Sequence, residues 1–185
     1  MIFDDFLHPE TFAALRDYAD SAEFVDEVNE ADGVSYPLIC KTIPTAIAAE
    51  ILANLHAYGK RKPENVTMFM RLSPEGVPVP HQAHHDGVMG DYSLMLYLNR
   101  SEHCQGGTEL LTHKETGLVA GDGNNAAIIE RDQNNAEAWE SSGLCDMVPN
   151  RAFLFESHLV HRAAPVGGFG SDQRDARLVL TVFFI

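Results

Sequence analysis

The sequence of 185 residues lacks any apolar run long enough to cross a bilayer, which excludes a transmembrane helix. Its N-terminus, Met1 to Asp5, lacks the basic segment of a signal peptide, so we expect the mature chain to begin here and to be cytoplasmic. The three cysteines, Cys40, Cys104 and Cys145, show no CxxC spacing. This pattern predicts reduced thiols in a cytosol-like compartment.

Basic residues are also scarce, with 13 Lys and Arg against 27 Asp and Glu and a formal net charge of −14. Such a charge repels phosphate backbones, disfavours nucleic-acid binding and favours a cationic or neutral substrate over a polyanion. The tight basic cluster Lys60-Arg61-Lys62 follows Gly59 at an expected helix end, where cations complement the helix dipole. No HExxH motif is present to indicate a zinc-dependent hydrolase.

The apolar content of 45% is that of a globular protein, and the length predicts a single domain over residues 1–185. Residues 1–62 read as helical support, with helices expected from Pro9 to about Ala22 and from about Pro44 to Tyr58. The segment between them, Ala31 to Lys41, reads as a loop. Residues 63–185 are expected to form a jelly-roll core.

Short strands separated by turn residues fill this second part. We predict a mainly β fold, a double-stranded β-helix or jelly roll, with the N-terminal helices packed on one sheet. The polar segment Arg131 to Met147, with Trp139 at its centre, reads as a mobile loop. The expected strands are Val66–Leu72, Val77–His85, Tyr92–Leu98, Thr108–Leu111, Ala126–Glu130, Ala152–Glu156 and Arg177–Phe184.

Three His-x-Asp/Glu motifs occur, and their contexts differ. His8-Pro9-Glu10 lies at a helix start, where the glutamate complements the dipole, and His113-Lys114-Glu115 reads as a solvated turn. Only His84-His85-Asp86 is followed at once by a buried strand and matched by a histidine later in the chain. This motif is therefore the candidate metal site.

On a strand, residues i and i+2 point to the same face, so His84 and Asp86 are expected to lie together while His85 points away. Two histidines and one carboxylate can hold one face of a ferrous ion and leave the other face open. The third ligand must come from a distant segment, and His158 and His161 both follow the strand that ends near Glu156. A structural zinc site built from His81, His84 and Asp86 is the alternative.

Several further segments carry a family resemblance that covers about residues 65 to 185. The chain resembles the 2-oxoglutarate/Fe(II)-dependent dioxygenase superfamily, in particular its prolyl-hydroxylase-like branch. This resemblance implies a double-stranded β-helix, a requirement for Fe(II), 2-oxoglutarate and O2, and oxidation of a second substrate with release of succinate and CO2. The segments are His84–Asp86, Leu96–Asn99, Gly106–Leu110, Val148–Phe155, His161–Val166 and Arg177–Phe184.

The resemblance also implies roles for individual residues. It makes His84, Asp86 and His161 the metal ligands, since relatives place the distal histidine four residues before a proline such as Pro165. It makes Arg177 the partner of the far carboxylate of 2-oxoglutarate, and an arginine that opens an apolar strand independently needs an anion.

Further contacts near the iron and 2-oxoglutarate are expected from residues that vary among relatives. Thr181 shares the face of Arg177 by strand parity and is expected to donate a hydrogen bond near the iron. Arg174 is the rival cation, in a polar loop. Relatives often place a tyrosine at the position of Leu96 or of His81, and we expect His81 to supply the missing contact with 2-oxoglutarate.

The sequence thus predicts an oxygenase that hydroxylates a C–H bond of a small-molecule or peptide substrate. Candidate substrates are a prolyl or other protein side chain, a free amino acid and a small metabolite. The alternative is a jelly-roll protein that binds a metal or ligand without oxygenase activity. The pattern carries no prediction of oligomeric state.

Overall fold

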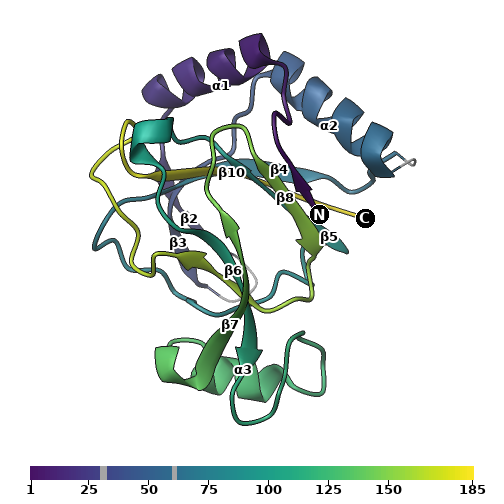
Figure 1. Cartoon of the computed structure of the whole chain (residues 1–185), viewed down its shortest axis with the longest axis vertical. Coiled ribbons are helices and arrows are strands. Elements are labelled where there is room, and N and C mark those ends of the chain that lie inside the picture. Colours follow the sequence, from purple (N-terminus) through teal and green to yellow (C-terminus); the bar gives the residue numbers. More distant parts are fainter. Residues whose placement is uncertain (30–32, 60–61) are drawn as a thin grey trace.

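The computed structural model describes residues 1–29, 33–59 and 62–185, so Lys60, Arg61 and the first residues of the predicted 31–41 loop lie outside the description. Two antiparallel sheets face each other, and two long helices cover the outer face of the larger one (Figure 1). The predicted jelly roll with N-terminal helices is confirmed. No helix among the described residues has the length and apolar character needed to span a membrane.

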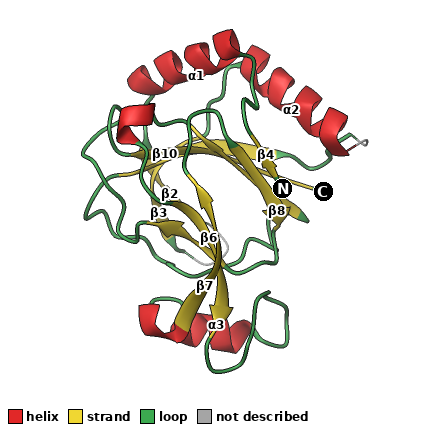
Figure 2. Cartoon of the chain, in the orientation of Figure 1, coloured by secondary structure: helices red, strands yellow, loops and turns green. Residues whose placement is uncertain are grey.

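Figure 2 shows the strands of both sheets in yellow. Within the described residues, the larger sheet has seven strands and the smaller sheet has three. The larger sheet has the order β1 (Ile2–Phe3), β8 (Ala152–Glu156), β5 (Tyr92–Tyr97), β10 (Arg177–Phe184), β4 (Thr67–Ser73), β3 (Ser35–Cys40) and β2 (Val25–Val28). The smaller sheet has the order β7 (Trp139–Asp146), β6 (Gly107–His113) and β9 (His161–Ala164).

Helices α1 (Pro9–Ser21) and α2 (Thr45–Gly59) begin and end within a residue or two of their predicted bounds. Proline suits the first turn of α1 because its missing N–H would have no partner there. The apolar faces of both helices pack on the larger sheet and form what we term the outer core. Its members include Leu15, Ala19, Ile47, Ile51 and Leu55 from the helices and Leu178, Leu180 and Val182 from β10.

The alternate residues of the same strands point between the two sheets and form the inner core. Val179 of β10 and Met95 and Tyr97 of β5 belong to it, together with Phe153 and Phe155 of β8. A strand that is apolar on both faces is expected when both faces are covered, as they are for β10. The candidate site opens beside this inner core.

The outer core should dominate stability. Leu180 is 0% exposed on the central strand β10, so Leu180→Ala should lower the free energy of unfolding by about 2–5 kcal/mol. Leu144 on β7 is 47% exposed, and Leu144→Ala should change the free energy of unfolding by less than about 0.5 kcal/mol. Urea unfolding of both variants measures the difference, and equal effects would contradict this location of the core.

Two predicted elements in the second half are wrong. Ala126–Glu130 is not a strand but part of helix α3 (Ala126–Asp132), which is followed by the short helix Ala136–Ala138. The segment Arg131–Met147 is not a mobile loop, because it contains strand β7. Trp139 is 3% exposed, and its indole N–H donates to the Asp132 carbonyl at 2.9 Å.

The predicted strand Val77–His85 is also wrong, since only His84 pairs there, through an isolated bridge to His161. Pro78 and Pro80 lack the N–H that a ladder requires, which accounts for the irregular path. The described part of the expected loop from 31 to 41 contains strand β3, which pairs with β2 and β4. Strands β1, β2 and β9 were not predicted.

Candidate metal and carboxylate site

The structure brings His84, Asp86 and His161 together between the two sheets. One ligand atom from each residue lies within 4.8 Å of the others. Nε2 of His161 is 3.2 Å from one carboxylate oxygen of Asp86, and Nε2 of His84 is 3.8 Å from the other. This is the only such group of three found in the described part of the chain.

Backbone pairing, more than strand parity, positions these side chains. His84 and His161 exchange two backbone hydrogen bonds, at 3.1 and 2.8 Å, which hold the two rings with centroids 4.5 Å apart. The backbone N–H of Asp86 donates to the Ser157 carbonyl at 2.7 Å. Asp86 is therefore fixed to the turn after β8, and His161 begins β9 just beyond that turn.

Backbone carbonyls that accept hydrogen bonds from Nδ1 also orient the two histidine rings. Nδ1 of His84 donates to the Gln82 carbonyl at 3.1 Å, and Nδ1 of His161 donates to the Leu159 carbonyl at 2.9 Å. Such contacts fix the tautomer and direct Nε2 of each ring to the centre of the group. Phe155 packs edge-on against His161, with centroids 4.8 Å apart. Both rings are thus preset to offer one lone pair to a metal ion.

The electrostatics of the group favour a bound cation. Burial, reinforced by the positive charge of His161, lowers the pKa of His84 to about 4, so this ring is neutral at physiological pH. Burial opposes ionisation of Asp86, yet the neighbouring histidines lower the pKa of its carboxyl. Burial likewise opposes charge on His161, but Asp86 raises the pKa of this ring. An ionised carboxylate and a neutral imidazole are the forms that bind metals.

Arg177 is 5% exposed at the start of β10. Its Nη2 donates to the Gly107 carbonyl at 3.3 Å, but its buried Nε has no partner. Burial lowers the pKa of Arg177 to about 10, which still leaves it charged at neutral pH. A buried cation with unused donors is suited to a carboxylate.

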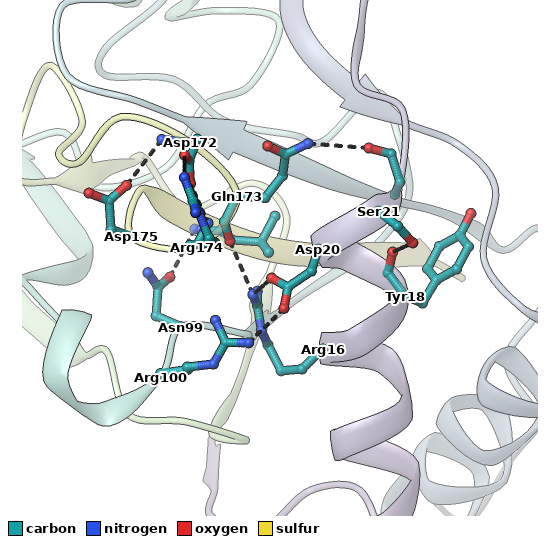
Figure 3. Close-up of polar contacts among 12 residues, drawn as sticks. Arg16, Tyr18, Asp20, Ser21, Asn99, Arg100, Asp172, Gln173, Arg174 and Asp175 are labelled. Atoms are coloured by element: carbon teal, nitrogen blue, oxygen red, sulfur yellow. Dashed lines mark hydrogen bonds and ion pairs between the residues drawn. The ribbon is translucent and has the colours of Figure 1, made fainter.

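The rival cation Arg174 is engaged elsewhere. Its guanidinium forms two hydrogen bonds to the Asp172 carboxylate and its side chain is 77% exposed (Figure 3). The adjoining Gln173 carbonyl accepts a hydrogen bond from Arg16 of α1, which also pairs with Asp20. These contacts fix the loop that leads into β10 and leave Arg177, not Arg174, facing the inner core.

The remaining predicted residues, Thr181 and His81, are not among the three converging side chains. Thr181 is buried on the same face of β10 as Arg177, and its hydroxyl is directed to the Met95 sulfur at 3.4 Å. His81 is not part of the three-residue group; its ring lies edge-on to Tyr36, and its buried Nδ1 has no hydrogen-bond partner. The zinc alternative based on His81 is therefore less well supported than the group with His161.

Of the two candidate distal histidines, His158 points away. Its ring stacks on His85 with centroids 6.2 Å apart, and its Nδ1 donates to the Gly121 carbonyl at 3.1 Å. Gly87 and Gly121 lie so close to these two rings that an added Cβ would come within 2.6 Å of them. His85 and His158 thus form a tightly packed contact outside the group.

Sequence reasoning missed two residues near Arg177. Leu96, assigned to the position of a tyrosine in relatives, faces the outer core, whereas Tyr97 faces the inner core and interacts electrostatically with Arg177. The Tyr97 phenol donates to the Cys145 carbonyl at 3.0 Å, and burial raises its pKa. Arg71 on β4 is the second missed residue. Strand parity identifies both once β5 and β4 are aligned with β10.

His113 is not in a solvated turn, contrary to the prediction. It is 1% exposed, and its ring nitrogens contact Thr116 at 2.9 Å and Asp132 at 3.0 Å. The ring also packs edge-on against Trp139. Helix α3 supplies Asp132, so the misassignment of this segment as a strand hid the partner of His113.

Structural comparison places this architecture among known folds. A prolyl hydroxylase from Trichoplax adhaerens, in complex with a peptide fragment of the hypoxia inducible factor oxygen degradation domain, superimposes with a TM-score of 0.58 at 14% identity, over 100% of this chain and 82% of that one. A prolyl-4-hydroxylase from Pseudomonas putida gives a TM-score of 0.56 at 18% identity, over 100% and 90%.

The chain has the fold of the prolyl-hydroxylase-like 2-oxoglutarate/Fe(II) dioxygenases. EvdO2 from Micromonospora carbonacea var. aurantiaca, complexed with 2-oxoglutarate, shares it with a TM-score of 0.53 at 17% identity, over 99% of this chain and 84% of that one. No protein-family model and no curated protein sequence matches the chain. The fold implied by the motif resemblance is thus confirmed by three-dimensional structure.

Proposed function

We propose that this protein is a 2-oxoglutarate- and Fe(II)-dependent dioxygenase that hydroxylates a C–H bond of a small-molecule or peptide substrate. The observation that carries this proposal is the arrangement of two oriented histidines and one carboxylate beside a buried arginine with unused donors. Three protein ligands on one face leave positions for a bidentate oxo acid and dioxygen.

The residues present fit the groups that this function requires. His84, Asp86 and His161 would hold the iron, because their preset nitrogens and ionised carboxylate supply neutral and anionic donors. When bound, the iron supplies the chemistry that couples oxidative decarboxylation of 2-oxoglutarate to oxidation of the substrate. Arg177 would bind the far carboxylate of 2-oxoglutarate and so orient the oxo acid toward the three ligands.

The surroundings support the same function. Tyr97 lies near Arg177, and contacts of its phenol with Thr108 Oγ1 at 2.9 Å and with the Cys145 carbonyl at 3.0 Å fix its ring in the wall beside the arginine. Met95, Phe155 and Val179 form an apolar wall that excludes water from the interior. Water exclusion strengthens each electrostatic contact at the site and protects reactive species.

We expect the purified chain to convert 2-oxoglutarate to succinate when Fe(II) and oxygen are supplied, slowly even without its substrate. Asp86→Ala should lower iron affinity at least about 10-fold and reduce succinate formation with it, since one of three ligands is lost. Calorimetric metal titration and succinate quantification with and without oxygen measure both effects. Tight metal binding without turnover would instead favour a ligand-binding jelly roll.

A further inference from the structure

A second arginine, partly buried, shares a cavity with Arg177. Arg71 of β4 pairs with Val179 of β10, and Ser73 pairs with Arg177, so both arginines point to the same side of the sheet. Both line a cavity that Gln82 and Arg162 also border. Its volume of about 50 Å³ is several times that needed by one water molecule, so a carboxylate group fits.

Arg71 has no carboxylate of the protein within ion-pair distance, although Asp86 acts on it from farther away. Its Nε is buried without a hydrogen-bond partner, and burial lowers the pKa of its guanidinium. Arg162, at the same cavity, is already neutralised by Glu109 at 2.6 Å. Among the arginines that the structure describes, only Arg71 and Arg177 have no carboxylate within 4.0 Å; the paired ones are Arg16, Arg100, Arg131, Arg151, Arg162 and Arg174.

The proposed cosubstrate does not supply the missing charge. One carboxylate of 2-oxoglutarate pairs with Arg177, and the other, together with Asp86, balances the two positive charges of the iron. The charge of Arg71 remains, and its buried Nε still has no hydrogen-bond partner. None of the residues that line the cavity is acidic, so an anion that pairs with Arg71 inside the cavity would have to be a bound ligand.

Arg71 also lies near the metal ligands. Electrostatic interaction links Arg71 with Asp86 and His84, whereas Arg177 acts on His161. Gln82 connects the cavity to the metal group, because its carbonyl orients the His84 ring. An anion held by Arg71 in this cavity would therefore lie next to the residue that orients the His84 ring.

We propose that Arg71 binds a carboxylate of the oxidised substrate, so that this substrate is a carboxylate-bearing small molecule or peptide end. This inference rests on the proposed function, since the charge balance assumes iron and 2-oxoglutarate at their sites. It also reverses the expectation drawn from the net charge of −14, because the local charge of this cavity is positive.

The test uses the full chain loaded with Mn(II), a redox-inert substitute for Fe(II) that accepts similar ligands. With 2-oxoglutarate at saturation, acetate is titrated as the minimal carboxylate, and paramagnetic relaxation of its methyl protons reports binding near the metal. We expect saturable relaxation with acetate but not with the uncharged acetamide. Arg71→Gln should weaken acetate binding at least about 10-fold, and Arg71→Lys should retain part of it.

A matched control variant and a separate titration show whether Arg71 binds a carboxylate of the substrate or a carboxylate of 2-oxoglutarate. Arg162→Gln should change acetate binding less than about 2-fold, because Arg162 is already paired with Glu109. Arg71→Gln should change the calorimetric affinity for 2-oxoglutarate less than about 3-fold, whereas Arg177→Leu should lower it at least about 10-fold.

Each outcome bears on a different proposal. If the wild-type chain binds neither Mn(II) nor 2-oxoglutarate, the proposed function itself fails. If both bind but the relaxation of acetate is not saturable, or equals that of acetamide, the inference about Arg71 is overturned. The comparison of acetate with acetamide uses only the wild-type chain, so it does not depend on whether a variant folds. If Arg71→Gln weakens 2-oxoglutarate as much as Arg177→Leu does, Arg71 binds the cosubstrate and the inference is again overturned.

Discussion

Replacing His161 with alanine should remove most of the metal affinity and most of the 2-oxoglutarate-dependent succinate formation, whereas His158→Ala should retain both. His161 is 3% exposed with Nε2 3.2 Å from Asp86, so it is a central member of the group. His158 is only three residues away, but its ring contacts His85 and the Gly121 carbonyl instead. Loss of one of three protein ligands should cost at least about 10-fold in metal affinity.

The comparison is made at saturating Fe(II), with succinate quantified by mass spectrometry and metal affinity by calorimetry. Both substitutions remove an imidazole from the short segment between β8 and β9 or its edge, so thermal unfolding of the two variants controls for general damage. Reversal of the pattern, with activity lost in His158→Ala and kept in His161→Ala, would move the metal to the other end of this segment.

The convergence of His84, Asp86 and His161 was predicted from sequence, by strand spacing for the first two and by the family resemblance for His161. His84 and Asp86 are two residues apart, and His161 stands four residues before Pro165. The argument from strand parity for His84 and Asp86 was incorrect, however, because Pro78 and Pro80 interrupt the expected strand. Backbone pairing of His84 with His161 and of Asp86 with Ser157 produces the same convergence. Tertiary contacts here replaced a regular strand without changing which side chains meet.

The segment from 126 to 146 could not be predicted because its local signals are ambiguous. Ala126 to Glu130 is a short apolar run with two isoleucines, and such a run suits a strand or a helix equally well. The contacts of Asp132 with His113 and with the Trp139 indole decide the outcome, and both depend on the completed fold. Strand β7 is polar because most of its residues are exposed.

The sequence around Arg71 contains a signal that the predictions from sequence did not use, a charged residue within an apolar strand. It interrupts the apolar strand Met68–Leu72 as Arg177 opens the apolar strand β10, and in each case a charged residue in a strand requires a partner. What sequence did not supply is the register between β4 and β10, which places Arg71 opposite Val179. Only this register shows that the two arginines share one cavity.

Arg177→Leu should raise the concentration of 2-oxoglutarate needed for half-maximal turnover at least about 10-fold and leave metal affinity within about 2-fold of wild type. The guanidinium is buried and has unused donors, and a charge-assisted contact with a carboxylate contributes about 1.5–3 kcal/mol. Metal affinity should persist because His84, Asp86 and His161 remain. Succinate formation across a 2-oxoglutarate titration, with separate metal calorimetry, measures both quantities.

Arg174→Leu is the matched control, because Arg174 lies in the same region of the chain but is exposed and paired with Asp172. It should change the 2-oxoglutarate requirement less than about 2-fold. Thermal unfolding separates binding from folding, since replacing a buried, unpaired cation with leucine should leave stability unchanged or raise it. An Arg177→Leu protein that is stable, binds metal and keeps the wild-type 2-oxoglutarate requirement would show that another cation holds the far carboxylate. Arg71 would then be the residue to test, because it is the other described arginine without a carboxylate partner.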